Sequence, residues 1–328
     1  MVFALADSKT AIIQRCFTLD MLDKALIGEL SNNCRMSFSN LAEKHSVSVN
    51  TIKNRVEQLL EDKVILGFDV TPKLSLFNAS FATIMLHLES RATREVIDRL
   101  GNNQFIMAVM TGLEPEGFAI AIYRNTDELN QAVEHLRTDS AVREVEVIQL
   151  LPPPSSKETV RATKTIDDLK TIDWKILYHL RWNGRMALKE IAEKAGKSVP
   201  TVRKRIEFMR KHDLIYESTL LNIGAVGTGM VITLVAETPD LSSSRQLEID
   251  ELIRKAYPEE YWLSWMSADR PVMLLTFYTA SAKVAGEIRN SLGSVVQGLR
   301  VVGQVISGEW EYFRDFRDKI LREKSGEA

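Results

Sequence analysis

The chain has 328 residues, 45% of them hydrophobic and 26% charged, and its 42 basic and 44 acidic side chains leave a net charge of −2. This length favours several compact units over one core, and the near-neutral charge argues against a protein that coats nucleic acid or a membrane along its whole length. Two cysteines cannot form a disulfide framework, so we expect a reducing cytoplasm. No apolar run reaches the roughly 20 residues of a membrane span, so no membrane partner is predicted.

The sequence repeats at a shift of 150 residues. Residues 22–65 align without a gap on residues 172–215, and the identical pairs include Asn33/Asn183, Arg35/Arg185, Ser48/Ser198, Thr51/Thr201 and Arg55/Arg205. We therefore predict a tandem duplication. The predicted order is an N-terminal helical extension (1–17), a winged helix-turn-helix (18–70), a ferredoxin-like domain (71–151), a proline-rich linker (152–165), a second winged helix-turn-helix (166–222), a second ferredoxin-like domain (223–309) and a C-terminal helical tail (310–328).

The start of each copy has helical periodicity. In the first copy, leucines four residues apart predict one helix, and residues 36–45 predict another. Ser48 suits the N-cap of a third helix over 48–61, since its hydroxyl can accept a backbone N–H. The core face expected for that helix consists of Val49, Ile52, Val56 and Leu59. A strand over 64–70, taken as part of a trailing hairpin, completes a winged helix-turn-helix, and the second copy repeats the pattern around a helix over 198–211.

The remainder of each copy alternates strands and helices in the order βαββαβ. In the first copy strands are predicted over 81–88, 105–110, 118–123 and 142–150, with helices over 93–100 and 127–136. The second copy follows with strands over 230–236, 262–266, 272–278 and 299–306 and helices over 247–256 and 282–292. This order is typical of a ferredoxin-like domain, so the predicted fold class is α+β. The tail from Trp310 has amphipathic spacing and predicts a helix.

These motifs resemble the Lrp/AsnC family of transcription regulators. The resemblance is most specific over LAEKHSVSVNTIKNRVEQLLEDKVI (41–65) and IAEKAGKSVPTVRKRIEFMRKHDLI (191–215). Lys63 and Asp213 depart from the family's usual glycine, which questions the turn geometry at that point. Family members usually dimerise by packing two βαββαβ sheets face to face, so the resemblance implies an intrachain pseudo-dimer, a homo-oligomer and double-stranded DNA as the partner.

The third helix of each copy is the expected DNA-binding element. In the first copy the candidates are Ser48, Asn50, Thr51, Lys53, Asn54 and Arg55, and in the second they are Ser198, Pro200, Thr201, Arg203, Lys204 and Arg205. Amide side chains can contact base edges, adenine in particular. An alternative for Arg55 and Arg205 is an ion pair within the module. Residues 18–70 have net charge −2 and residues 166–222 have +4, so the second module is expected to contribute more raw affinity.

The resemblance also implies a small-molecule effector, often an amino acid, at the loop between the second and third strands. The candidate residues are Thr111, Gly112, Glu114, Ser267 and Asp269, and a solvated hairpin turn is the alternative. Two other functions stay open: a sirohaem-decarboxylase-like enzyme on the same fold, and a DNA-architectural protein. The second strand of each domain lacks a histidine, and the five histidines have no metal-ligand spacing. The sequence therefore predicts no catalytic residue, cofactor or metal site.

Overall fold

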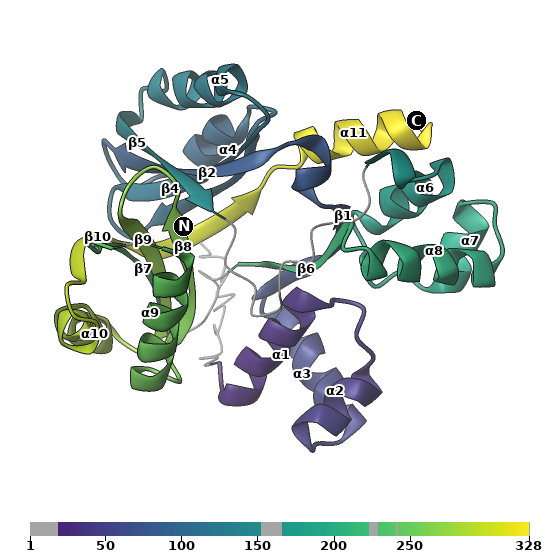
Figure 1. Cartoon of the computed structure of the whole chain (residues 1–328), viewed down its shortest axis with the longest axis horizontal. Coiled ribbons are helices and arrows are strands. Elements are labelled where there is room, and N and C mark those ends of the chain that lie inside the picture. The colour runs from purple at the N-terminus through teal and green to yellow at the C-terminus, as the bar shows by residue number, and fades with distance from the viewer. Residues whose placement is uncertain (1–18, 152–165, 223–228, 241, 328) are drawn as a thin grey trace, which may run out of the picture.

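The computed structural model describes residues 19–151, 166–222, 229–240 and 242–327 (Figure 1). The predicted N-terminal extension and the proline-rich linker lie outside these residues. The described part consists of two helix-turn-helix modules and two ferredoxin-like units, which confirms the predicted α+β fold class. No helix among the described residues is long and apolar enough to cross a membrane.

Module 1 is the name we give to the first helix-turn-helix. It contains α1 (Met21–Asn32), α2 (Phe38–His45) and α3 (Val49–Glu61). Ser48 caps α3 as predicted, because its hydroxyl accepts the backbone N–H of Thr51 at 3.0 Å. Ile52, Val56 and Leu59 are buried. The prediction for Val49 is wrong: it is the first residue of α3, one turn before the buried Ile52, and it is 45% exposed.

Module 2 repeats this arrangement with α6 (Thr171–Leu180), α7 (Leu188–Lys194) and α8 (Val199–Lys211). Ser198 caps α8 through the backbone N–H of Thr201. The buried face of α8 consists of Val202, Ile206 and Met209. A short 3-10 turn, η2 (Ile166–Asp168), precedes α6.

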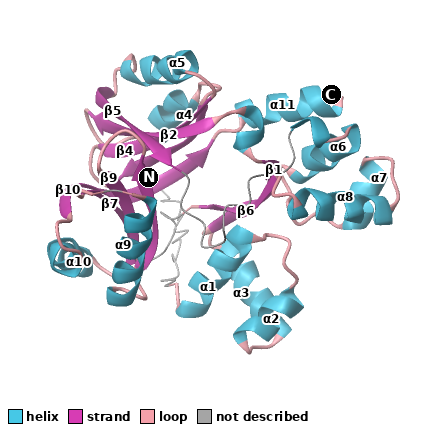
Figure 2. Cartoon of the chain, viewed as in Figure 1, coloured by secondary structure: helices cyan, strands magenta, loops and turns pink. Residues whose placement is uncertain are grey.

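Each ferredoxin-like unit has the predicted βαββαβ order. The first contains β2 (Ser80–Leu88), α4 (Arg94–Gly101), β3 (Ile106–Gly112), β4 (Glu116–Tyr123), α5 (Thr126–Arg137) and β5 (Val142–Leu151), after the 3-10 turn η1 (Leu74–Phe77). The second contains β7 (Met230–Glu237), α9 (Ser243–Ala256), β8 (Tyr261–Ser267), β9 (Val272–Thr279), α10 (Ala282–Val295) and β10 (Arg300–Tyr312). Their helices lie on the outside of the strands (Figure 2).

The two sheets join into one closed barrel. Strand β10 pairs with β7 of its own unit and with β3 of the other, and β5 pairs with β2 and with β8. The barrel interior is filled by apolar side chains from both copies: Met85, Met110, Phe118, Ile148, Val235, Val272, Leu274 and Val305. The pseudo-dimer that a duplicated chain would form is therefore present inside one polypeptide, and closure leaves the sheets no free edge in the described part.

The predicted hairpin of each module is wrong. Strands β1 (Ile65–Pro72) and β6 (Ile215–Leu221) instead pair with each other, antiparallel, with Val70 opposite Glu217. Each strand needs a partner for its backbone N–H and C=O groups, and the other copy supplies it. Helix α1 packs on β6 while α6 packs on β1, so each module uses the ribbon strand of the other. We call this two-stranded β1–β6 sheet the ribbon.

Lys63 and Asp213 keep the turn geometry that glycine usually provides. Both have a φ of +56°, in the left-handed region. Lys63→Gly is expected to raise the free energy of unfolding by about 0.5–1 kcal/mol, because a side chain in this region costs about 1–2 kcal/mol and the greater entropy of unfolded glycine offsets part of it. Urea denaturation would measure the change. Glu61→Gly, at the end of α3, serves as the control and should destabilise; a loss of stability with Lys63→Gly would contradict the prediction.

The C-terminal helix begins later than predicted. Trp310 and Tyr312 belong to β10, where they lie opposite Met110 and Ala108 of β3. A strand is favoured there because β3 would otherwise lack a partner on that side. The helix α11 (Asp315–Ser325) follows and packs on α6, so the C-terminal tail connects the barrel to module 2.

Candidate nucleic-acid interface

The solvent-facing side of α3 is polar and nearly neutral. Asn50, Lys53 and Asn54 are exposed. The ammonium group of Lys53 lies 3.6 Å from the carboxylate of Glu57. Thr51 is half-buried, and its hydroxyl lies 2.8 Å from that of Ser48. The first turn of α3 thus presents amides, while its one lysine is compensated by a neighbouring acid.

The matching side of α8 is basic. Pro200, Thr201, Arg203 and Lys204 are exposed. Among the described residues, neither Arg203 nor Lys204 has an ion-pair partner. Thr201 and Ser198 repeat the hydroxyl contact, at 2.9 Å. Two uncompensated cations on one helical face suit a polyanionic partner.

Arg55 and Arg205 form ion pairs within their modules. Arg55 lies 2.8 Å from Asp20 and 3.3 Å from Asp23, and Arg205 donates its Nε to Asp173 at 2.6 Å. Both Asp23 and Asp173 are fully buried. Hydrogen bonding to Asp173 raises the pKa of Arg205. The structure favours the alternative given for these two arginines, because each fastens its third helix to the first helix of the module.

A lysine-lined cavity in module 2 was not predicted from the sequence. A cavity of about 410 Å³ lies between the start of α6 and the turn that joins α7 to α8, and its lining includes Lys170, Lys175 and Lys197. At the positions shifted by 150 residues, module 1 has Asp20, Ala25 and Val47. Aligning the two copies reveals these three extra lysines, but only the fold brings residues 170–175 beside residue 197.

The two modules exchange hydrogen bonds through a matched pair of arginines. Arg35 donates to the carbonyl oxygens of Gly184 and Met186, the second at 3.0 Å. Arg185 donates to the carbonyl oxygens of Cys34 and Met36, the second at 3.2 Å. Burial lowers the pKa of both arginines. Together with the ribbon, this exchange holds the modules in a fixed mutual arrangement.

Cys34 lies at the centre of this contact and is fully buried. Burial, with the nearby carboxylates of Glu217 and Asp69, raises the pKa of its thiol to about 12. At pH 8 only about one thiol in 10,000 would then be ionised. We expect Cys34 to resist iodoacetamide in the folded chain and to react after denaturation, as site-resolved mass spectrometry would measure. Rapid alkylation of Cys34 under native conditions would contradict this.

The five candidate effector residues lie where the two copies meet, at two separate places. Gly112 pairs with Ser307 of β10, and a Cβ on Gly112 would lie 2.7 Å from the carbonyl oxygen of Glu116. Glu114 is exposed and Thr111 is buried. In the other hairpin, Ser267 is buried opposite Leu150 of β5, and its hydroxyl donates to Asp269. The polar side chains of Ser267 and Asp269 are therefore satisfied within their own hairpin.

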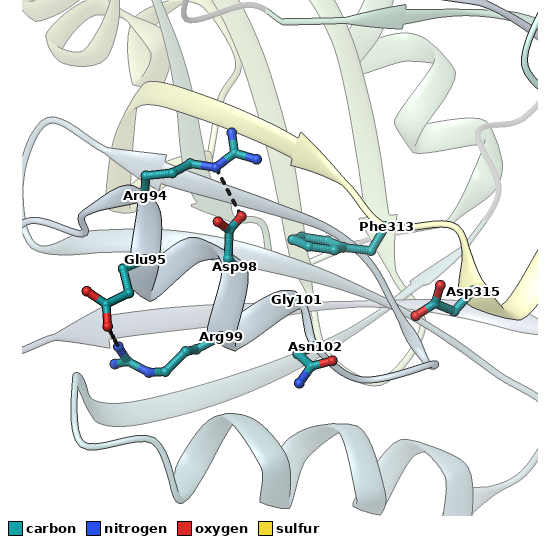
Figure 3. A pocket seen from close by; sticks show the side chains of 8 residues that line it. All are labelled: Arg94, Glu95, Asp98, Arg99, Gly101, Asn102, Phe313 and Asp315. Atoms are coloured by element: carbon teal, nitrogen blue, oxygen red, sulfur yellow. Dashed lines mark hydrogen bonds and ion pairs between the residues drawn. The ribbon is translucent and has the colours of Figure 1, made fainter.

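A second cavity lies at the corner between α4 and the segment before α11 (Figure 3). The charged groups that α4 contributes are already paired: Arg94 lies 3.0 Å from Asp98 and 2.8 Å from Glu311, and Arg99 lies 3.8 Å from Glu95. Phe313 packs so closely on Gly101 that a Cβ there would overlap its ring. None of the candidate effector residues lines this cavity. Among the described residues, no group of three or more His, Cys, Asp or Glu side chains is placed to hold a metal ion.

Two family models match the helix-turn-helix modules. The AsnC-type helix-turn-helix domain matches residues 19–60, and a winged helix-turn-helix DNA-binding model matches residues 169–216. An uncharacterised HTH-type transcriptional regulator of Pyrococcus abyssi is 33% identical over 120 residues, which cover 35% of this chain and 80% of that relative. The HTH-type transcriptional regulator Ptr1 of Methanocaldococcus jannaschii is 27% identical over 116 residues, 34% of this chain and 78% of that relative.

One solved structure is similar over almost the whole chain. The siroheme decarboxylase NirDL has a TM-score of 0.54 and 10% sequence identity, with 94% of this chain and 99% of that chain covered. At this identity the similarity concerns the fold alone. The matches to both modules and to a relative over 80% of its length decide the family: the chain belongs to the Lrp/AsnC-type HTH transcriptional regulators, and it contains two copies of their helix-turn-helix unit.

Proposed function

We propose that this regulator binds specific double-stranded DNA sequences in the cytoplasm by inserting α3 and α8 into major grooves, without enzymatic activity of its own. The observation that supports this most is the exposed pair Arg203 and Lys204 on α8, since neither has an ion-pair partner among the described residues. Such cations gain most from neutralising phosphates or contacting guanine. The amides of Asn50 and Asn54 support the same role for α3.

A titration of the full chain against the DNA upstream of its own gene, at two salt concentrations, tests this function. Arg203→Ala/Lys204→Ala is expected to weaken binding about 10- to 100-fold and to reduce its salt dependence. Lys53→Ala/Asn54→Ala tests module 1 in the same assay. Lys255→Ala/Lys283→Ala, on the helices outside the barrel, removes as much charge and should leave binding near that of the wild type. A folded wild-type chain that binds no duplex would refute the proposal.

A decarboxylase-like function is the second candidate, supported by the whole-chain similarity to the fold of NirDL. Against it, neither β3 nor β8 contains a histidine to donate a proton. Titration with sirohaem, followed by its visible absorption, separates the two functions. A spectral shift that saturates at one sirohaem per chain would favour the enzyme, and an unchanged spectrum would favour the regulator.

We also propose that a small-molecule effector binds at the two junctions around Gly112 and Ser267. Their position between the copies supports this, because a ligand there would contact both halves of the barrel. The two hairpins differ in sequence, so their affinities should differ. Thermal shift with the common amino acids tests the effector. Light scattering tests the homo-oligomer that the family suggests. Gly112→Thr should abolish any shift that arises at the first junction, because its side chain would overlap backbone atoms there.

A further inference from the structure

The outward-facing side chains of the two modules differ in chemistry at matched positions, although the inward-facing ones agree. Arg55 and Arg205 make the same internal ion pair, and Ser48 and Ser198 make the same cap. These shared contacts maintain one fold in both copies. The exposed positions are not needed for that fold, and their differences therefore concern what each module touches.

Module 2 gathers uncompensated positive charge around the lysine-lined cavity. Lys170 and Lys197 are exposed there, whereas Lys175 lies 3.1 Å from Glu327. The counterpart of Lys170 in module 1 is Asp20, whose carboxylate is engaged by Arg55. Module 1 would therefore repel, or fail to attract, an anionic group at the place where module 2 attracts one.

The recognition helices differ in charge in the same way, since α8 is more basic than α3. Arg203 and Lys204 of α8 replace Lys53 and Asn54 of α3. The charge of Lys53 is reduced by Glu57, but Arg203 and Lys204 have no ion-pair partner among the described residues. Phosphate contacts of this kind add affinity without depending on base sequence.

Module 1 instead presents groups that distinguish bases. Asn50 and Asn54 are exposed on the first turns of α3, beside Val49, which is 45% exposed. An amide can bond to adenine N6 and N7 together, and an apolar group can contact the thymine methyl. In α8 the counterpart of Asn50 is Pro200, which has no side-chain donor or acceptor, and Val199 is half-buried.

The link between the modules prevents them from acting as independent binders. Arg35 and Arg185 exchange hydrogen bonds across it, and β1 pairs with β6 over most of its length. Figure 1 shows the modules on either side of this ribbon, away from the barrel. Each end of a bound duplex therefore meets a chemically different module in a fixed order.

We propose that this chain recognises a non-palindromic operator: α3 selects A·T pairs at one half-site through Asn50, Asn54 and Val49, and module 2 holds the other half-site through backbone phosphates at Lys170, Lys197, Arg203 and Lys204. This assignment rests on the proposed DNA-binding function. It adds a polarity, since the chain binds its operator in one orientation.

The test selects duplexes from a randomised library with the full chain and then compares two variants on the enriched sequence. Lys170→Ala/Lys197→Ala should weaken binding to all duplexes about equally and make the negative slope of log affinity against log salt shallower by about 2. Asn50→Ala/Asn54→Ala should keep that slope and lose about 10-fold or more of the preference for A·T at one half-site. Replacing adenine with 7-deazaadenine there should weaken the wild type but not the second variant.

The outcomes separate the two proposals. If the folded wild type enriches no sequence, the DNA-binding function itself fails. If it enriches inverted repeats, or if both variants change the salt slope equally, the function stands and the asymmetric operator is refuted. Matching thermal unfolding midpoints would show that both variants are folded, as expected for changes at exposed positions.

Discussion

Asp69→Ala is expected to lower the free energy of unfolding by about 3 kcal/mol or more, the largest single loss we anticipate. Asp69 is a ribbon residue with 4% of its surface exposed, and its carboxylate faces the guanidinium of Arg317 on α11 at 3.9 Å. Burial raises the pKa of Asp69, while Arg317 and Arg314 act in the opposite direction. Removing the carboxylate leaves the mostly buried guanidinium of Arg317 without its acidic partner and takes one of two nearby acids, Asp69 and Asp318, from Arg314. Such an uncompensated buried charge costs far more than the pair itself contributes.

Urea denaturation measures this loss, and a second variant identifies its cause. Asp69→Ala/Arg317→Met also removes the cation that Asp69→Ala leaves without an acidic partner, so it should recover part of the lost stability. Glu61→Ala removes an exposed carboxylate and should cost under about 0.5 kcal/mol. Limited proteolysis should release the C-terminal helix earlier in Asp69→Ala. If the double variant lost as much unfolding free energy as its two single variants lose together, the ion-pair explanation would be wrong.

Arg35→Ala and Arg185→Ala are each expected to cost about 2–3 kcal/mol, because each arginine is a charged donor to two carbonyl oxygens of the other module. Arg185 also stacks on Phe38, with its guanidinium 4.6 Å from the ring centre. Lysine cannot reproduce two parallel hydrogen bonds, so Arg35→Lys should recover little. Unfolding of the full chain in urea measures all of these changes.

A double-mutant cycle distinguishes a shared contact from two separate ones. The arginines flank the same buried Cys34 and form one reciprocal exchange, so the double variant should cost less than the sum of the single variants by at least about 0.5 kcal/mol. Two additive losses would mean that the modules are stabilised independently. The cycle should also affect DNA: loosening the link should weaken binding to the whole operator more than binding to either half-site.

The sequence predicted most of the local structure correctly. Its 150-residue repeat identified the duplication, and the spacing of apolar residues placed the third helices within one residue of α3 and α8. These features depend on contacts between residues close in the chain, which periodicity and capping residues report directly. The ion pairs of Arg55 and Arg205 were foreseen as one of two alternatives, and the structure was needed to choose between them.

Other features depend on residues that are far apart in the sequence. Periodicity identified β1 and β6 as strands but gave each a local hairpin, because a strand pattern does not state its partner. The end of β10 was taken for a helix, since Trp310 and Phe313 have helical spacing, and the pairing with β3 that makes Trp310 and Tyr312 part of a strand cannot be read from that spacing. The lysine-lined cavity likewise exists only where α6 meets the turn before α8.

The sequence by itself thus determined most of the elements, their duplication and the two candidate recognition helices, all of which follow from local physical preferences. The tertiary structure alone decided how the copies combine: a closed barrel, a shared ribbon, and the reciprocal contacts of Arg35 and Arg185. The physical reason is that backbone groups and charges that lack a local partner must find one elsewhere in the chain. In this protein each copy supplies that partner to the other.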